Sequence, residues 1–103
     1  MKVEFKMCGE RLTALMVGEI DHHTAKGICE KIDFRINVDK PQKFVFDFSG
    51  VSFMDSSGLA VVLGRKKLCD RIGAKVYVAN IGQGPKKILK MAGADKFIEF
   101  LED

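Results

Sequence analysis

The stretch KFVFDF at residues 43–48 indicates the fold more clearly than any other part of the chain. Its three phenylalanines alternate with other residues, which is the period-two pattern of a β-strand. Val45, on the opposite side of that strand, is also apolar, so we expect a central parallel strand covered on both faces. A break containing Pro41 precedes the strand, and we expect a loop over residues 49–54 to follow it.

Two further strands are expected on the N-terminal side of this stretch. Residues 3–8 (VEFKMC) and 11–17 (RLTALMV) are rich in strand-forming residues, and Gly9-Glu10 has the length of a two-residue hairpin turn. Gly18 is expected to end the second strand. These two strands therefore predict an antiparallel hairpin.

Helical spacing of apolar residues predicts two longer helices. The first carries one apolar stripe and has Asp21 as its expected N-cap, because an aspartate can accept hydrogen bonds from the first turn. The second helix is expected to begin near Asp55 or Ser56 and to end at Gly73. The expected buried residues are Ala25, Ile28, Cys29, Ile32 and Ile36 in the first helix, and Leu59, Val62, Leu63, Cys69 and Ile72 in the second.

The rest of the chain adds a strand at residues 75–79 and a third helix with Pro85 in its first position. Gly93 is expected to end that helix, and residues 96–101 form an apolar tail whose type the pattern does not decide. The order is β-β-α-β-α-β-α, which requires right-handed crossovers. We therefore predict one α/β domain over residues 1–103: a mixed, mostly parallel sheet of four to five strands, with an antiparallel N-terminal edge hairpin and helices packed against it.

Composition excludes several classes of protein. Apolar residues make up 47% and charged residues 30% of the 103 residues, as in globular domains rather than disordered chains. The longest unbroken apolar run, Leu59–Leu63, is too short to cross a membrane. The N-terminus lacks the apolar stretch of a secretory signal, so we expect a cytoplasmic protein. A net charge of only +3 does not favour a nucleic-acid binder.

The cysteines do not indicate a disulfide framework or a metal site. Cys8, Cys29 and Cys69 are odd in number and contain no CxxC pair. Cys29 and Cys69 lie on apolar helical stripes, which favours a place in the core over a reactive role.

The segment FMDSSGL at residues 53–59 is the first candidate functional site. It places the carboxylate of Asp55 and the hydroxyls of Ser56 and Ser57 where a strand passes into a helix. Ligands bind at the carboxyl ends of parallel strands, and a helix N-terminus offers unpaired N–H groups and a partial positive charge that tolerate an anion. The simpler alternative is that Asp55 or Ser56 only caps the helix.

A serine hydrolase is not favoured by this segment. The nucleophile elbow G-x-S-x-G needs a glycine at 54 if centred on Ser56, and glycines at 55 and 59 if centred on Ser57. The chain has Met54, Asp55 and Leu59 at these positions. We therefore expect no enzymatic activity.

The segment Asp21-His22-His23-Thr24 is the second candidate, because it follows a strand and should lie at the same sheet edge. Neighbouring histidines on a helix point about 100° apart and rarely bind one metal ion, so no metal is expected. The simpler alternative is an exposed start of a helix.

Two other motifs carry weaker signals. Gly82-Gln83-Gly84 lacks the third glycine of a dinucleotide loop, since Lys87 stands in its place, and no cofactor is expected. The basic clusters at 65–67 and 86–90 are most often solvated helix faces. A modest contribution to binding an acidic partner is the alternative.

Three segments together resemble one known family. GEIDHHTA at 18–25, FMDSSGL at 53–59 and VLGR at 62–65 closely resemble the sporulation anti-sigma factor antagonists, STAS-domain proteins that regulate sigma-F in endospore-forming bacteria. The resemblance spans Val3 to Phe100. The Asp-Ser-Ser-Gly-Leu motif is typical of the wider antagonist family, and Asp-His-His-Thr-Ala points to its sporulation branch. Two features depart from the family: relatives often continue into a final helix after Phe100, and this chain has a positive net charge.

The resemblance implies a regulatory switch. The unphosphorylated protein would bind a dimeric anti-sigma factor that is also an ATP-dependent serine kinase, and so release the sigma factor. The kinase would phosphorylate Ser56, and a metal-dependent PP2C-type phosphatase would reverse the modification; nucleotide and metal belong to these partners, and nucleic acid and membrane are not expected to bind directly. The partner-binding residues implied are Asp21, His22, His23, Thr24, Asp55, Ser56, Ser57 and Gly58.

Several alternatives remain open at this point. The chain could serve another anti-sigma kinase, such as one of a general stress response, or act as a small-molecule or nucleotide sensor. A hydrolase using Ser56 with His22 or His23 is a more distant alternative. Residue chemistry alone does not distinguish Ser56 from Ser57 as the phosphate acceptor, so that choice rests on the resemblance.

Overall fold

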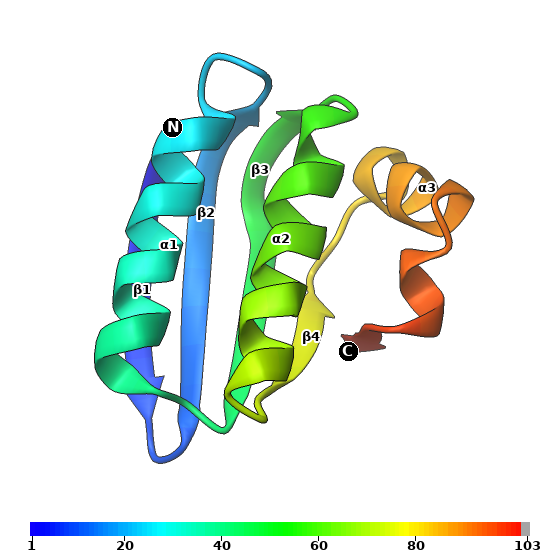
Figure 1. The fold of residues 1–103 in the computed structure, drawn as a ribbon. Coiled ribbons are helices and arrows are strands. Elements are labelled where there is room, and N and C mark those ends of the chain that lie inside the picture. Colours follow the sequence, from blue (N-terminus) through cyan, green and yellow to red (C-terminus); the bar gives the residue numbers. More distant parts are fainter. Residues whose placement is uncertain (102–103) are drawn as a thin grey trace.

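A computed structural model describes residues 1–101 of the chain (Figure 1). The elements follow one another as β1 (Lys2–Cys8), β2 (Arg11–Ile20), α1 (Ala25–Asp39), β3 (Lys43–Met54), α2 (Ser57–Arg71), β4 (Lys75–Ala79), α3 (Gln83–Met91), the short 3-10 helix η1 (Ala94–Lys96) and β5 (Glu99–Leu101).

The strands form one sheet in the order β1-β2-β3-β4-β5. β1 and β2 are antiparallel, whereas β2, β3, β4 and β5 pair in parallel. The mixed, mostly parallel sheet with an antiparallel edge hairpin is thus confirmed. The apolar tail supplies both η1 and the fifth strand.

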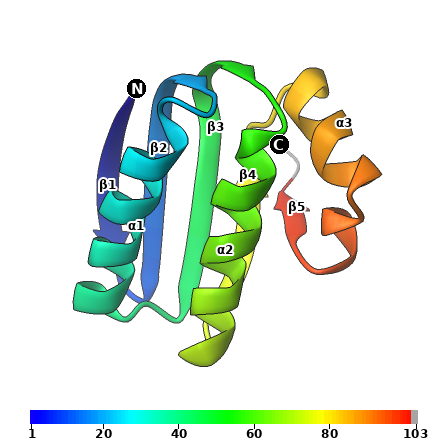
Figure 2. The same cartoon turned by 45° about the horizontal axis from the view of Figure 1, so that its top comes forward.

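Helices α1 and α2 lie side by side across one face of the sheet, and α3 packs beside α2 near the β4–β5 side (Figures 1 and 2). Phe44, Phe46 and Phe48 are buried, as the alternating pattern predicts. Val45 is also buried, but the expectation of cover from both faces needs correction. It lies on the opposite face between its pairing partners Thr13 and Tyr77, so neighbouring strands rather than these two helices shield it.

The expected helical stripes face the core, but only part of each is fully buried: Ala25, Cys29, Leu59 and Leu63 are half-buried against it. The buried residues of α1 are Ile28, Ile32 and Ile36, and those of α2 include Val62 and Cys69. Ile72 is 38% exposed, because it follows the last residue of α2 rather than lying on its buried side. Burial, followed by the nearby Asp70 carboxylate, raises the pKa of the Cys69 thiol to about 11, as befits a core residue.

Both strands that lead to the candidate site are longer than expected. β2 continues through Gly18, which has φ 116°, because Glu19 and Ile20 still pair with β3. β3 continues to Met54 instead of ending before residue 49, and its register against β2 shifts twice along the way. The residues predicted as a loop therefore belong mainly to a strand.

The helix starts also differ from expectation. Thr24, not Asp21, occupies the N-cap position of α1, and Pro85 is the third residue of α3 rather than the first. Gly73 and Gly93 have φ values of 77° and 78°, so the two glycines end their helices as expected. No helix within residues 1–101 has the length and apolar character needed to cross a membrane.

Candidate functional site

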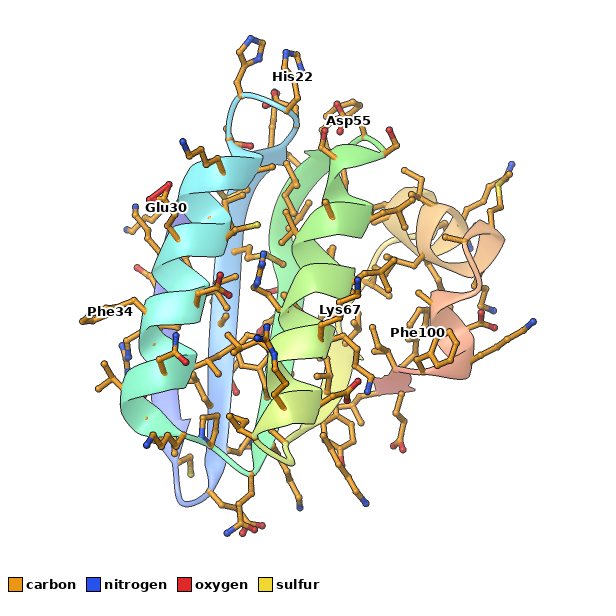
Figure 3. All side chains as sticks on the ribbon, viewed as in Figure 1. His22, Glu30, Phe34, Asp55, Lys67 and Phe100 are labelled. Carbon is orange, nitrogen blue, oxygen red and sulfur yellow. The ribbon has the colours of Figure 1, made fainter. Side chains whose placement is uncertain are left out.

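Two loops come together at the edge of the sheet where β2 and β3 end. The β2–α1 loop holds Asp21 to Thr24, and the β3–α2 loop holds Asp55 and Ser56. The backbone N–H of Asp55 donates a hydrogen bond to the carbonyl of Ile20, with an N–O distance of 3.1 Å. Figure 3 shows His22 and Asp55 at this same end of the molecule. The structure thus brings the two predicted segments together.

The β2–α1 loop is held by its own hydrogen bonds. Oδ1 of Asp21 accepts from the backbone N–H of His23 at 2.8 Å and from that of Thr24 at 3.1 Å. The Thr24 hydroxyl accepts from the N–H of Asp21 and donates to the carbonyl of Glu19, both at 3.0 Å. Asp21 and Thr24 are therefore first of all the residues that shape this loop.

The acidity of Asp21 reflects these contacts. Desolvation raises the pKa of its carboxyl, but the hydrogen bonds from Thr24 and His23 and the nearby His23 ring outweigh this and leave the pKa below its ordinary value of 3.8. Asp21 is therefore an anion at neutral pH and keeps its role as acceptor.

His22 projects from this loop into solvent (Figure 3), and His23 is exposed as well. Their ring centroids are 3.9 Å apart, and Nδ1 of His23 lies 3.8 Å from Oδ1 of Asp21. Across residues 1–101, no three His, Cys, Asp or Glu side chains gather as a metal site requires. The two rings offer an exposed surface for contact.

Asp55 caps α2 and leaves Ser56 free. The Asp55 carboxylate accepts from the N–H of Ser57 at 2.8 Å, while Ser56 stands in the N-cap position without a side-chain capping bond. Ser56 is exposed and Ser57 is half-buried. The alternative that one of these residues only caps the helix therefore applies to Asp55, whose carboxylate caps α2, and not to the hydroxyl of Ser56.

The first turn of α2 does not offer the unpaired N–H groups that the sequence suggested. Ser57 N–H is taken by Asp55, and the N–H groups of Gly58 and Leu59 donate to the carbonyls of Asp55 and Ser56 at 3.0 Å each. An anion on Ser56 would therefore be met by the helix dipole and solvent rather than by these three donors.

Gly58 is buried beneath the site. A Cβ at this position would overlap the side chain of Met54, the last residue of β3. Met54 is itself only 5% exposed, so it has little room to move. Gly58 therefore allows the end of β3 and the start of α2 to approach closely, which fixes where Ser56 stands.

Phe53 is a surface residue at the site that the sequence analysis missed. It is 51% exposed and directly precedes Met54 and Asp55. The register of β3 against β2 shifts twice between Asp47 and Phe53, after which Met54 pairs with the buried Ile20 and Phe53 pairs with Glu19, so the Phe53 ring is left exposed. The alternation at residues 44–48 could not reveal this exposed ring, because the two register shifts that follow are set by pairing with β2.

Comparisons with known proteins agree with this architecture. A family model described as STAS domain matches residues 12–103. A relative from Paenibacillus polymyxa named "Anti-sigma F factor antagonist" is 32% identical over 92 residues, which cover 89% of this chain and 79% of the relative.

Two solved structures have the same fold. The anti-sigma factor antagonist SpoIIAA in its unphosphorylated form matches with a TM-score of 0.83 and 24% identity, over 99% of this chain and 90% of that one. The Bacillus cell fate determinant SpoIIAA in the phosphorylated form matches with a TM-score of 0.76 and 25% identity, over 99% and 93%. The chain belongs to the STAS domain family and, within it, to the anti-sigma factor antagonists.

Proposed function

We propose that the unphosphorylated chain binds an anti-sigma factor that is also a serine kinase, and thereby releases the sporulation sigma factor, sigma-F. In this proposal the kinase inactivates the chain by phosphorylating Ser56, and a PP2C-type phosphatase restores it. The name of the Paenibacillus polymyxa relative supports sigma-F as the pathway, and the similarity to SpoIIAA, which has been solved in a phosphorylated form, supports the modification.

The observation that carries the proposal is the exposed hydroxyl of Ser56 at the meeting point of the two loops. Its side chain makes no capping bond, because Asp55 already caps α2. A kinase must reach the acceptor oxygen from solvent, and the exposed Ser56 meets this need better than the half-buried Ser57. Asp55 and Ser57 on either side of it, together with Asp21, His22, His23 and Thr24 of the adjoining β2–α1 loop, are proposed to form the docking surface, with Gly58 buried below.

The switch is proposed to act by charge and bulk rather than by refolding. A phosphate adds about −1.5 to −2 charges at neutral pH. It would stand beside the Asp55 carboxylate and against partner groups that had accommodated a neutral hydroxyl. Each loss of about 1.4 kcal/mol in binding energy lowers affinity tenfold, so one such clash is enough to separate the complex.

The experiment that tests the acceptor is phosphopeptide mass spectrometry after incubation with the cognate anti-sigma F factor and ATP. We expect one phosphate on Ser56, none in Ser56→Ala, and unchanged phosphorylation in the matched variant Ser57→Ala. A phosphate on Ser57 in the wild-type chain would contradict the assignment of Ser56 while leaving the fold untouched.

Binding measurements test the switch itself. We expect Ser56→Ala to bind the anti-sigma factor as the wild-type chain does, and Ser56→Asp to bind at least about tenfold more weakly. Calorimetry with the purified kinase would report both affinities. Equal affinities for the wild-type chain and Ser56→Asp would contradict the charge-based switch, and preferential binding to a stress-response anti-sigma kinase would replace sigma-F as the pathway.

A further inference from the structure

We propose that the exposed side of α3 is a second docking element, which takes a carboxylate-rich segment of the anti-sigma factor kinase. We call this surface the lysine ridge and define it as Gln83, Lys86, Lys87, Lys90 and Met91 together with Ile81. The inference rests on the proposed function, because it names the same partner. It adds that this partner carries an acidic segment, which binding at Ser56 alone does not require.

The ridge combines positive charge with the apolar side chains of Ile81 and Met91. Its residues line a shallow hollow of about 450 Å³, and three of the six lining residues are lysines while none is acidic. Met91 is 79% exposed, the highest value among the large apolar residues that are exposed in the described part of the chain. An exposed methionine among lysines suits a partner that offers both carboxylates and an apolar side chain.

Helical spacing places these side chains on one side of α3. Gln83, Lys87 and Met91 follow each other at intervals of four residues, and Lys86 and Lys90 form a second row beside them. Lys87 and Lys90 are exposed, whereas Lys86 is half-buried with its Nζ 5.7 Å from the centroid of the Phe100 ring. Lys87 and Lys90 are thus the two charges best placed to meet a partner.

The position of α3 makes the ridge an extension of the candidate site. β4 ends at Ala79, at the carboxyl edge of the parallel strands, and α3 begins four residues later. Both views show α3 beside the upper part of α2, close to the β3–α2 loop (Figures 1 and 2). A partner seated on Ser56 would therefore reach the ridge without a large conformational change.

An acidic protein segment fits this surface better than a polyphosphate or a lipid surface. Juxtamembrane basic clusters that recruit anionic lipids hold about four to eight basic residues, more than the three lysines here. No aromatic side chain lines the hollow to stack a nucleic-acid base.

The test compares two double variants that change net charge by the same amount. Lys87→Glu/Lys90→Glu reverses the charge of the ridge, and Lys6→Glu/Lys75→Glu reverses two exposed lysines on β1 and at the start of β4, outside the basic clusters at 65–67 and 86–90. Affinity for the purified anti-sigma factor kinase is measured for each in 50 mM and 500 mM salt, with thermal melting to check the fold. We expect the ridge variant to bind about tenfold more weakly at low salt and the control about as wild type, with the difference shrinking at high salt.

Other outcomes separate this inference from the proposed function. If wild type and the ridge variant bind the kinase equally, the ridge is no docking element and the proposed function stands. If the wild-type chain does not bind the kinase at all, both proposals fail. The wild-type chain could instead bind duplex DNA or phosphatidylserine vesicles and the ridge variant fail to do so, while both bind the kinase equally. That result would assign the ridge to a different partner and overturn the inference.

Discussion

The two loops at the sheet edge begin in the same way and are stabilised differently. Each has an aspartate directly after a strand, and each aspartate accepts backbone N–H groups that would otherwise lack partners. The β2–α1 loop adds the threonine hydroxyl of Thr24, which bonds to Asp21 and Glu19. The β3–α2 loop instead depends on close packing, with Met54 pressed against Gly58.

This difference suits the two loops to different tasks. Hydrogen bonds within the first loop hold a fixed surface on which His22 and His23 stand. In the second loop the Asp55 carboxylate caps α2, so the Ser56 hydroxyl makes no capping bond. A group can therefore be added to Ser56 without breaking a hydrogen bond that the fold needs. The proposed phosphorylation of Ser56 would therefore cost the fold little stability.

The largest expected effect on stability comes from filling the space at Gly58. We expect Gly58→Ala to lower the free energy of unfolding by about 1–3 kcal/mol, because the added Cβ overlaps a buried methionine. Gly64→Ala, in the same helix but with nothing within 4 Å of its Cβ, should instead stabilise by up to about 1 kcal/mol. Urea unfolding of both variants measures the contrast.

Repeating the Gly58→Ala substitution in a chain with a smaller residue at position 54 separates the packing effect from other causes. If overlap with Met54 is the reason, Gly58→Ala should cost far less in a chain that already carries Met54→Ala. An equal cost in both backgrounds would show that the loop does not depend on this contact.

The ion pair between α1 and α2 is expected to have the next largest effect. Arg65 Nε lies 2.6 Å from Asp33 Oδ1, both atoms are buried, and neither has a hydrogen-bond partner elsewhere in residues 1–101. Asp33→Ala should cost about 1–2 kcal/mol, because it leaves the Arg65 charge uncompensated while the 36% exposure of the Asp33 side chain moderates the loss. Helices α1 and α2 begin directly after the two loops, so a change in how the helices pack should also alter the loops. We therefore expect the backbone amide resonances of both Asp21 and Asp55 to shift in NMR spectra of this variant.

The pair of Lys66 and Asp70 within α2, whose Asp70 carboxylate is exposed, provides the control for this prediction. Asp70→Ala should change stability by less than about 0.5 kcal/mol. Similar losses for Asp33→Ala and Asp70→Ala would mean that burial adds nothing to the interhelical pair.

The hydrogen-bonded loop is expected to show a smaller, pH-dependent effect. Because the folded pKa of Asp21 lies below its unfolded value, its carboxylate contributes stability above about pH 4, and this contribution disappears as pH falls through the folded pKa. The stability difference between wild type and Asp21→Asn should therefore shrink between pH 6 and pH 3. A carboxyl resonance of Asp21 that titrates at or above 3.8 would contradict the hydrogen-bonding account.

Sequence patterns predicted the order of elements well because apolar periodicity and glycine positions are local signals. The phenylalanine alternation located β3, and Gly73 and Gly93 located two helix ends. The ends of β2 and β3 were missed, since their last residues are set by pairing across the sheet rather than by local composition. The same reason explains Phe53, which the expected loop concealed.

The site could be predicted only in part. Asp21 and Asp55 were identified because each follows a predicted strand. The rule for parallel strands then placed both at one edge of the sheet. Which side chain caps α2 was not decided by sequence, because Asp55 and Ser56 are both good capping residues and only the backbone geometry separates them. That geometry also separates the exposed Ser56 from the half-buried Ser57.

The smallest expected effect on stability is at the histidine pair. His22 and His23 are exposed, and their side chains donate no backbone-supporting hydrogen bond among residues 1–101, so His22→Ala and His23→Ala should change the unfolding free energy by less than about 0.5 kcal/mol. If the first loop serves to hold these rings toward a partner, the same variants should weaken binding to the anti-sigma factor roughly fivefold, as loss of an interface side chain does. Calorimetry and urea unfolding of the same samples compare the two quantities. Loss of stability with unchanged binding would mean that the rings serve the fold, and the contrast between the two loops would then disappear.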